Sequence, residues 1–285
     1  MYGKIKCSCR YIWHTQKGEK ILSIYHKVIG DGYPIVMLHG WTLDHQVMLN
    51  AMEPLFEKRS HWKRIYIDLP GMGNSEPQLS IQNSDNILEA ILCLLDEIIP
   101  DQQFIVCGNS YGGYIARGIV RSRQDKVRGL LLMAPLIIPE YDERVVPQQT
   151  VLKKDNDLIS RLSPEEADEF CSMGVVQGQT EWERFQNEIL LPSKQTNHEF
   201  VNNIRQNGYG FTFDISFKLE HPTLIITGRQ DNVVGYQDAW QLIEDYPRAT
   251  FAVLDMAGHN LQIEQTDVFN ELVHNWLNRL ELDNF

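Results

Sequence analysis

The chain has 285 residues, a length that suits one large α/β domain with a sizeable core. Hydrophobic residues make up 43% of the sequence and charged residues 22%, which is ordinary for a globular protein. The formal net charge is -12, and the sequence contains no block of lysine or arginine. This charge pattern argues against nucleic acid and against an anionic membrane as partners.

The number of cysteines and the N-terminal segment indicate the cellular compartment of the protein. Five cysteines, an odd number, do not indicate a disulfide framework. The pair Cys7 and Cys9 lacks the further ligands that a zinc site needs. The N-terminus has no apolar stretch of secretory length, and no run approaches the roughly 18 apolar residues of a membrane span. We therefore expect a cytoplasmic protein that needs no metal and no cofactor.

Short apolar runs alternate with helical patterns along the chain, which predicts a mostly parallel, twisted sheet with helices on both faces. The expected strands are, in chain order, Ile21–Val28, Ile35–His39, Arg64–Asp68, Gln102–Cys107, Val127–Met133, Thr223–Thr227 and Thr250–Leu254. The expected helices are His45–Lys58, Ile81–Ile99, Gly113–Ser122, Tyr236–Tyr246 and Asp267–Leu280. The residues Gly30-Asp31-Gly32 predict a hairpin turn that joins two early antiparallel strands.

The alternation stops between Leu136 and about Leu219, where the sequence indicates helices and loops. We interpret residues 136–219 as an inserted helical cap, and residues 1–135 and 220–285 together as the core domain. Two helix starts within the cap match the capping-box pattern, one at Ser163 and one at Thr180. Large apolar side chains are expected to pack the cap against the core, with one or two of them facing a bound molecule: Phe170, Met173, Trp182, Phe185, Phe200 and Phe211.

One serine lies between two glycines in the run Gly108-Asn109-Ser110-Tyr111-Gly112. An apolar strand pattern precedes this run, and a helical pattern follows it. A Gly-x-Ser-x-Gly in that setting is typical of a nucleophile elbow, a strand-to-helix turn so tight that only very small residues fit two places either side of the serine. Such a turn exposes the hydroxyl at a helix N-terminus, where negative charge is favoured. The alternative is a glycine-rich turn with an idle serine.

A serine hydroxyl needs a base to take its proton, and histidine suits that task when a buried carboxylate fixes its tautomer. We favour His259, because it follows the expected strand 250–254 after a glycine-containing loop, and catalytic groups collect in loops beyond strand ends. Of the other downstream histidines, we interpret His198 as a surface residue, His221 as a loop residue and His274 as a helix residue.

For the carboxylate we favour Asp231, which lies just past the C-terminal end of the expected strand 223–227. Aspartate is also a common N-cap residue, so a turn or cap role for the helix near Gly235 is the alternative. Asp255 is the second candidate. It lies so close to His259 in the chain that it would not reach the far ring nitrogen comfortably.

Four patterns occur in one order along the chain, namely Leu38-His39-Gly40-Trp41, the glycine-rich stretch from Asp68 to Ser75, the elbow at Ser110, and Gly258-His259. Together they resemble the α/β-hydrolase superfamily, in its single-domain branch with an inserted cap. The resemblance covers about residues 21–280. It implies an α/β-hydrolase fold with the helical cap inserted after the sixth strand and lying over the elbow serine.

The resemblance also implies an oxyanion hole formed by two backbone N–H groups, those of Trp41 and Tyr111. The side chains of these two residues either line an acyl pocket or pack, and the sequence does not decide between these roles. His39 is interpreted as a structural histidine that bonds nearby backbone. The stretch from Asp68 to Ser75 is expected to shape the edge of the site without taking part in the chemistry.

These assignments predict a serine hydrolase that acts on a small-molecule acyl substrate, a carboxylic ester in the first place. Ser110, His259 and Asp231 would form its catalytic triad, and the reaction would pass through an acyl-enzyme. Epoxide hydrolases and haloalkane dehalogenases carry aspartate at the elbow, so both are disfavoured.

Other functions stay open. The elbow and the string Gly258–Glu264 are similar to carbon–carbon bond hydrolases of meta-cleavage products, although Thr42-Leu43-Asp44 and Asn260 depart from the pattern of that group. Proline iminopeptidases are a third enzyme class, but no acidic cluster in the cap marks an amine-binding site. A small-molecule receptor with little turnover is the alternative from a different class, and the intact serine, histidine and aspartate argue against a purely binding role.

Overall fold

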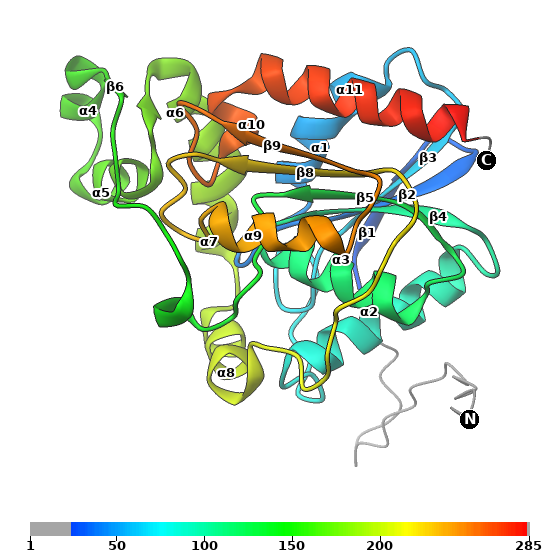
Figure 1. Ribbon diagram of the computed structural model, residues 1–285. Coiled ribbons are helices and arrows are strands. Elements are labelled where there is room, and N and C mark those ends of the chain that lie inside the picture. Colours follow the sequence, from blue (N-terminus) through cyan, green and yellow to red (C-terminus); the bar gives the residue numbers. More distant parts are fainter. Residues whose placement is uncertain (1–23, 284–285) are drawn as a thin grey trace.

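The computed structural model describes residues 24–283, so Cys7, Cys9 and the start of the strand expected from Ile21 lie outside the described part. A seven-stranded sheet in the order β1-β3-β2-β4-β5-β8-β9 forms the centre of the molecule (Figure 1). Neighbouring strands are parallel, except that β1 runs antiparallel to β3. The strands are β1 His26–Ile29, β2 Tyr33–Leu38, β3 Trp62–Ile67, β4 Phe104–Asn109, β5 Val127–Met133, β8 Thr223–Gly228 and β9 Ala249–Leu254. This architecture confirms the predicted fold class.

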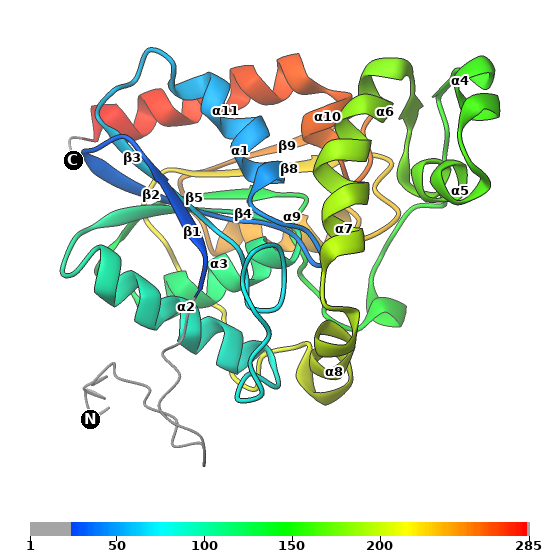
Figure 2. The same cartoon turned by 180° about the vertical axis from the view of Figure 1, so that it is seen from behind.

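Helices cover both faces of the sheet, as the alternating pattern predicts (Figures 1 and 2). One face carries α1 Gln46–Met52 and α11 Thr266–Leu282, and the other carries α2 Ser84–Ile98, α3 Tyr111–Ser122 and α9 Gln237–Trp240. Strands β4 and β8 are buried along their whole length because helices cover them on both sides. None of the helices between residues 24 and 283 is both long and apolar enough to cross a bilayer.

The turn at Gly30-Asp31-Gly32 joins two strands of opposite direction, as predicted, but the strands do not pair, so the predicted hairpin is wrong. It reverses the chain, with φ 74° at Gly30 and φ 120° at Gly32, but β3 lies between β1 and β2. The reason is burial. β2 is apolar along most of its length and becomes buried between two parallel neighbours, whereas the half-exposed β1 suits the edge of the sheet.

Between β5 and β8, residues 134–222 leave the sheet and form an insertion made mainly of helices. It contains α4 Asn156–Arg161, α5 Pro164–Met173, α6 Gln179–Phe185, the π-helical turn Gln186–Leu190, α7 Leu191–Gln195, α8 His198–Gly208 and a ladder of β6 Lys153–Lys154 with β7 Val176–Gln177. Figures 1 and 2 show α4 to α7 at the end of the sheet to which β8 and β9 point. Five described strands precede the insertion, whereas we expected it after a sixth.

The two expected capping boxes in the insertion have different outcomes. Ser163 caps α5 and shares reciprocal hydrogen bonds with Glu166, which confirms the first. The second is wrong, because α6 begins at Gln179 and the extended residue before it, Gly178, is its N-cap. Thr180 therefore lies inside the first turn of α6.

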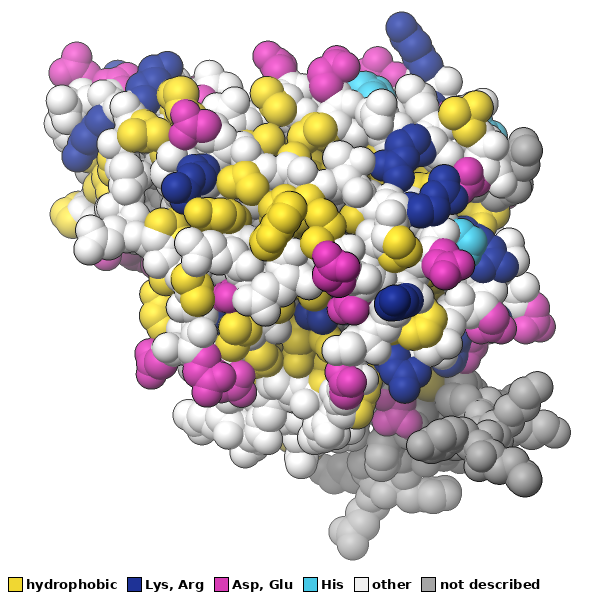
Figure 3. Space-filling model, in the orientation of Figure 1, with side chains coloured by type: hydrophobic (Ala, Val, Ile, Leu, Met, Phe, Trp, Pro, Cys, Tyr) yellow, Lys and Arg dark blue, Asp and Glu magenta, His cyan; other side chains and the backbone are white. Residues whose placement is uncertain are grey.

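On the face shown in Figure 3, acidic and basic side chains are scattered among each other and do not gather in one block of a single sign.

Candidate active site

Ser110 lies at the sharp turn between β4 and α3. Its backbone has φ 51° and ψ -117°, a left-handed conformation that is strained for a residue with a side chain. A Cβ atom on Gly108 would lie 2.3 Å from the carbonyl oxygen of Gly112, and one on Gly112 would lie 2.4 Å from the carbonyl oxygen of Leu38. Neither glycine position has room for a side chain, so the turn has the tight geometry expected of an elbow.

The imidazole of His259 lies between the hydroxyl of Ser110 and the carboxylate of Asp231. Its Nε2 is 2.9 Å from Ser110 Oγ, and its Nδ1 is 3.0 Å from Asp231 Oδ2. Because a carboxylate only accepts, Nδ1 carries the proton and Nε2 accepts the hydrogen bond that the serine hydroxyl donates. The Asp231 side chain is 0% exposed and that of His259 is 13% exposed. The structure thus brings together the three residues that we proposed for catalysis.

Parallel strands place these residues side by side, although they lie far apart in the sequence. Ser110 directly follows β4, Asp231 follows β8, and His259 follows β9. The carboxyl ends of parallel strands meet at one edge of a sheet, which is where open α/β sheets bind ligands.

Asp231 has two roles at once. Its Oδ1 accepts from the backbone N–H groups of Val233 and Val234, at 2.9 and 3.0 Å, while its Oδ2 meets His259. The turn role that we considered as the alternative is therefore real and coexists with the contact to the imidazole. The second candidate, Asp255, is exposed and accepts from the side chain of Gln230.

The remaining candidate histidines lie elsewhere. His198 begins α8, His274 lies within α11, and His221 contacts Arg128. His39 is buried, and its Nδ1 donates to the carbonyl of Gly40 while its Nε2 accepts from the N–H of Leu69. Burial lowers the pKa of His39, so the ring is neutral. The interpretation of His39 as a structural residue is confirmed.

The loop after β2 packs directly onto the elbow. A Cβ atom on Gly40 would lie 2.9 Å from Asn109 Oδ1 and 3.2 Å from Ser110 Cβ. The next residue is Trp41, whose backbone N–H donates no hydrogen bond within residues 24–283. Tyr111 begins α3, and the first N–H groups of a helix have no acceptor inside it. Both proposed oxyanion donors therefore belong to segments that meet at Ser110.

The side chains of Trp41 and Tyr111 differ in their surroundings. Tyr111 is fully buried, and its hydroxyl is hydrogen-bonded to Ser84 Oγ at 2.7 Å, so it packs. Trp41 packs edge-on against the rings of Tyr111 and Tyr209 and also lines a cavity at the elbow. The sequence left both roles open for both residues.

This cavity has a volume of about 250 Å³ and opens onto Ser110 and His259. Its apolar wall consists of Trp41, Leu43, Leu136, Met173, Phe185, Ile189, Leu190, Tyr209, Val233 and Val234. Polar side chains also reach it, namely Thr42, Asn109, Arg144, Glu169, Ser193, Arg205 and Asn260. Of the apolar side chains expected to pack the cap, Met173 and Phe185 line the cavity, while Phe170 and Trp182 pack around Phe185.

Comparison with known proteins identifies the family. The family model described as the alpha/beta hydrolase fold matches residues 33–266. The chain belongs to the α/β-hydrolase family. An alpha/beta superfamily hydrolase from Oenococcus oeni has a crystal structure that superposes with a TM-score of 0.83 at 34% identity, over 90% of this chain and 96% of that one.

Two relatives of this α/β-hydrolase have names that state an activity. A pimeloyl-[acyl-carrier protein] methyl ester esterase from Shewanella woodyi is 25% identical, over 90% of this chain and 98% of the relative. A 2-hydroxy-6-oxononadienedioate/2-hydroxy-6-oxononatrienedioate hydrolase from Pseudomonas putida is also 25% identical, over 92% of this chain and 94% of the relative. The relatives thus include a methyl ester esterase and a 2-hydroxy-6-oxononadienedioate hydrolase.

A half-buried carboxylate links the histidine loop of this hydrolase to the insertion. Glu264 Oε1 accepts from the backbone N–H groups of Val175 and Val176, at 2.6 and 3.1 Å, and its Oε2 accepts from that of Gly258 at 2.6 Å. Burial raises the pKa of Glu264 to about 7, although these three donors act in the opposite direction. Glu264 touches no reacting group, so it is a positioning residue for the loop that carries His259. Sequence reasoning missed this role, because the partners of Glu264 are main-chain groups of a distant segment.

Proposed function

We propose that this α/β-hydrolase is a serine hydrolase that cleaves a small-to-medium acyl substrate, in the first place a carboxylic ester. The observation that carries the proposal is the continuous hydrogen-bonded path from Ser110 through His259 to the buried Asp231. A neutral imidazole with one nitrogen on a carboxylate and the other on a serine hydroxyl is the arrangement that general-base activation of a serine requires. We also propose that residues 136–219 act as a cap over this site.

In this mechanism Ser110 Oγ attacks the carbonyl carbon of the ester while its proton moves to His259 Nε2. Asp231 stabilises the imidazolium that forms. The backbone N–H groups of Trp41 and Tyr111 donate hydrogen bonds to the oxyanion, and each donor stabilises the transition state by about 3 kcal/mol. Collapse of the tetrahedral intermediate breaks the ester C–O bond, and His259 donates its proton to the leaving oxygen.

Water completes the cycle. His259 takes a proton from a water molecule as the water oxygen attacks the acyl carbon, and the second intermediate collapses with return of that proton to Ser110 Oγ. The products are a carboxylic acid and an alcohol. A cavity of about 250 Å³ with a largely apolar wall suits an acyl group of small to medium size.

The Pseudomonas putida relative supports a second candidate, hydrolysis of a carbon–carbon bond in a meta-cleavage product. The two candidates share Ser110 and differ in the bond that breaks. Purified protein supplied with simple p-nitrophenyl esters and, separately, with a ring-opened meta-cleavage product discriminates them. The candidate whose substrate turns over with the higher kcat/KM is favoured.

The catalytic assignment is tested with three variants, a fluorophosphonate probe and p-nitrophenyl butyrate. Ser110→Ala should abolish labelling and turnover, because the nucleophile is gone. Asp231→Asn should lower kcat by about three to four orders of magnitude, because the amide no longer holds the reactive tautomer. Asp255→Asn is the matched control, since this exposed carboxylate lies outside the site, and it should behave as the wild type. Undiminished turnover by the Ser110→Ala protein would refute the proposal, and absence of turnover in the wild type would favour a receptor.

A further inference from the structure

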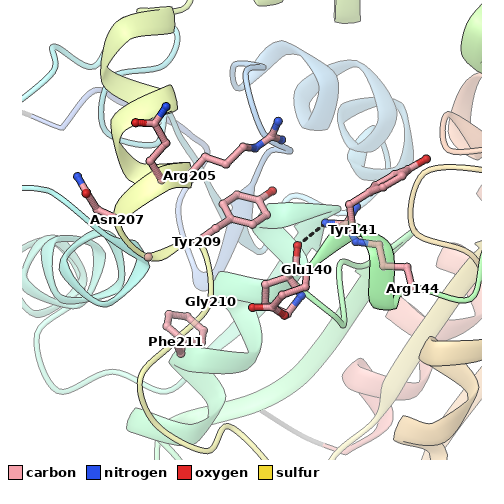
Figure 4. Close-up of a pocket in the computed structure, with 11 residues that line it drawn as sticks. Glu140, Tyr141, Arg144, Arg205, Asn207, Tyr209, Gly210 and Phe211 are labelled. Carbon is pink, nitrogen blue, oxygen red and sulfur yellow. Dashed lines mark hydrogen bonds between the residues drawn. The ribbon is translucent and has the colours of Figure 1, made fainter.

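Figure 4 shows a second, larger cavity of about 590 Å³. It shares part of its wall with the nucleophile cavity. Residues 139–141 and 205–211, together with Arg144, form its wall, so it lies between the start of the insertion and the end of α8. Three residues line both cavities, namely Arg144, Arg205 and Tyr209. Two of these three carry a positive charge, in a chain whose formal net charge is -12.

Arg144 is held rigidly by main-chain oxygens. Its guanidinium donates to the carbonyls of Ile138, Pro139 and Val233, at 2.8, 2.7 and 3.1 Å. These contacts use N–H donors of the guanidinium. No carboxylate in the described part of the chain forms an ion pair with Arg144, although the charge of Asp231 acts on it from nearby. Arg144 therefore supplies a fixed positive field at the junction of the two cavities.

Arg205 is held by aromatic faces. Its guanidinium carbon lies 5.4 Å from the ring centre of Tyr209 and 6.0 Å from that of Trp41. Figure 4 shows the Tyr209 ring beside the Arg205 side chain. Cation–π contacts orient a guanidinium without using its N–H donors. No carboxylate within residues 24–283 forms an ion pair with Arg205. Its guanidinium also hydrogen-bonds to the Tyr209 side chain, and the other N–H donors of the five remain for a ligand.

Trp41 and Gly40 connect Arg205 to the elbow at Ser110. The Trp41 ring that Arg205 overlies belongs to the residue whose backbone N–H we assign to the oxyanion hole. The neighbouring Gly40 lies against the elbow serine, since a Cβ atom added at Gly40 would be 3.2 Å from Ser110 Cβ. Glu140 lines the larger cavity and Glu169 lines the nucleophile cavity, but neither forms an ion pair with an arginine of the described part. A planar guanidinium with free N–H donors matches the geometry of a carboxylate.

We propose that Arg205, in the field of Arg144, forms an anion-binding subsite, and that the natural acyl group carries a free carboxylate at its far end. This inference rests on the proposed hydrolase function. The preferred substrate is then a monoester of a short dicarboxylic acid, with its ester carbonyl at Ser110 and its carboxylate at Arg205. The burial of Tyr209 raises the pKa of its phenol to about 12, so its hydroxyl stays protonated and offers one more donor at the same place.

The test uses two methyl esters of equal chain length, monomethyl glutarate and methyl pentanoate, with methanol release as the readout. The wild-type full chain should hydrolyse the charged ester with a kcat/KM about tenfold higher, the effect of one charge-assisted hydrogen bond. Arg205→Gln should lower the ratio of charged to neutral kcat/KM about tenfold. Arg161→Gln is the matched control, because this exposed arginine ends α4 and lines neither cavity, and it should keep the wild-type ratio. High salt should reduce the wild-type ratio, since Arg205 is exposed to screening.

Equal kcat/KM values for the two esters in the wild type, or equal ratios in the two arginine variants, would overturn the subsite while leaving the hydrolase assignment intact. If neither ester is hydrolysed, turnover of p-nitrophenyl butyrate decides whether the proposed function fails, and calorimetry with the Ser110→Ala protein then tests the subsite alone. Monomethyl glutarate should bind this protein about tenfold more tightly than it binds the Ser110→Ala, Arg205→Gln double variant. Equal affinities would refute the subsite.

Discussion

The backbone at Ser110 predicts that glycine is more stabilising than alanine at this position. The observed φ of 51° and ψ of -117° cost a residue with a Cβ atom about 1–3 kcal/mol. Glycine removes that strain, but its conformational entropy costs about 0.5–1 kcal/mol relative to alanine. Ser110→Gly and Ser110→Ala delete the same hydroxyl and the same hydrogen bond to His259, so their difference isolates the backbone. We expect the free energy of unfolding to be about 1 kcal/mol higher for the glycine variant.

Urea denaturation followed by circular dichroism measures this difference. The control is a second glycine–alanine pair at Asn275, an exposed position within α11. There the order should be reversed, with alanine more stable by about 1 kcal/mol, because ordinary helical backbone favours it. If alanine is as stable as glycine at position 110 while the pair at Asn275 behaves as expected, the strain argument is wrong.

Two further predictions concern the supports of the site. Gly112→Ala should lower the free energy of unfolding by about 3 kcal/mol, because the new Cβ would lie 2.4 Å from a main-chain oxygen of Leu38, and a loss below about 0.5 kcal/mol in urea denaturation would contradict this. Burial raises the pKa of Glu264 from 4.5 to about 7, so the folded protein binds this proton more tightly than the unfolded chain does, and the associated stability is complete below about pH 4.5 and is lost as the pH rises through 7. The difference in unfolding free energy between wild type and Glu264→Gln should therefore fall by about 3 kcal/mol between about pH 4.5 and pH 7. A difference that stays constant over this range would disprove the raised pKa of Glu264.

The parts of the site that the sequence predicts are those that depend on neighbours along the chain. Glycines two places either side of Ser110 indicate a close approach of strand and helix, because no other residue fits there. The loop positions of Asp231 and His259 follow from apolar runs that end just before them. In a parallel sheet such ends must share one edge, so local patterns are enough to bring these residues together.

Other features depend on contacts between distant segments, and the sequence does not predict them. The pairing of β1 with β3 depends on which strand gains more by burial, which no local turn signal reveals. Arg205 lies in a polar helical stretch that has the composition of a solvated surface. Its relation to Trp41 appears only when the insertion folds back over the loop after β2. The start of α6 was likewise not predictable from the pattern at Thr180, since the extended conformation of Gly178 decides where this helix begins.

The carboxylate of Glu264 binds the insertion only through backbone N–H groups, so the side chains of the residues that donate them are not needed for these hydrogen bonds. Residues 175 and 176 are free to mutate among apolar types of similar bulk without loosening them, and proline is barred because it has no N–H to offer. The side chains at these two positions of the insertion can thus change while the hydrogen bonds to the loop that carries His259 stay the same.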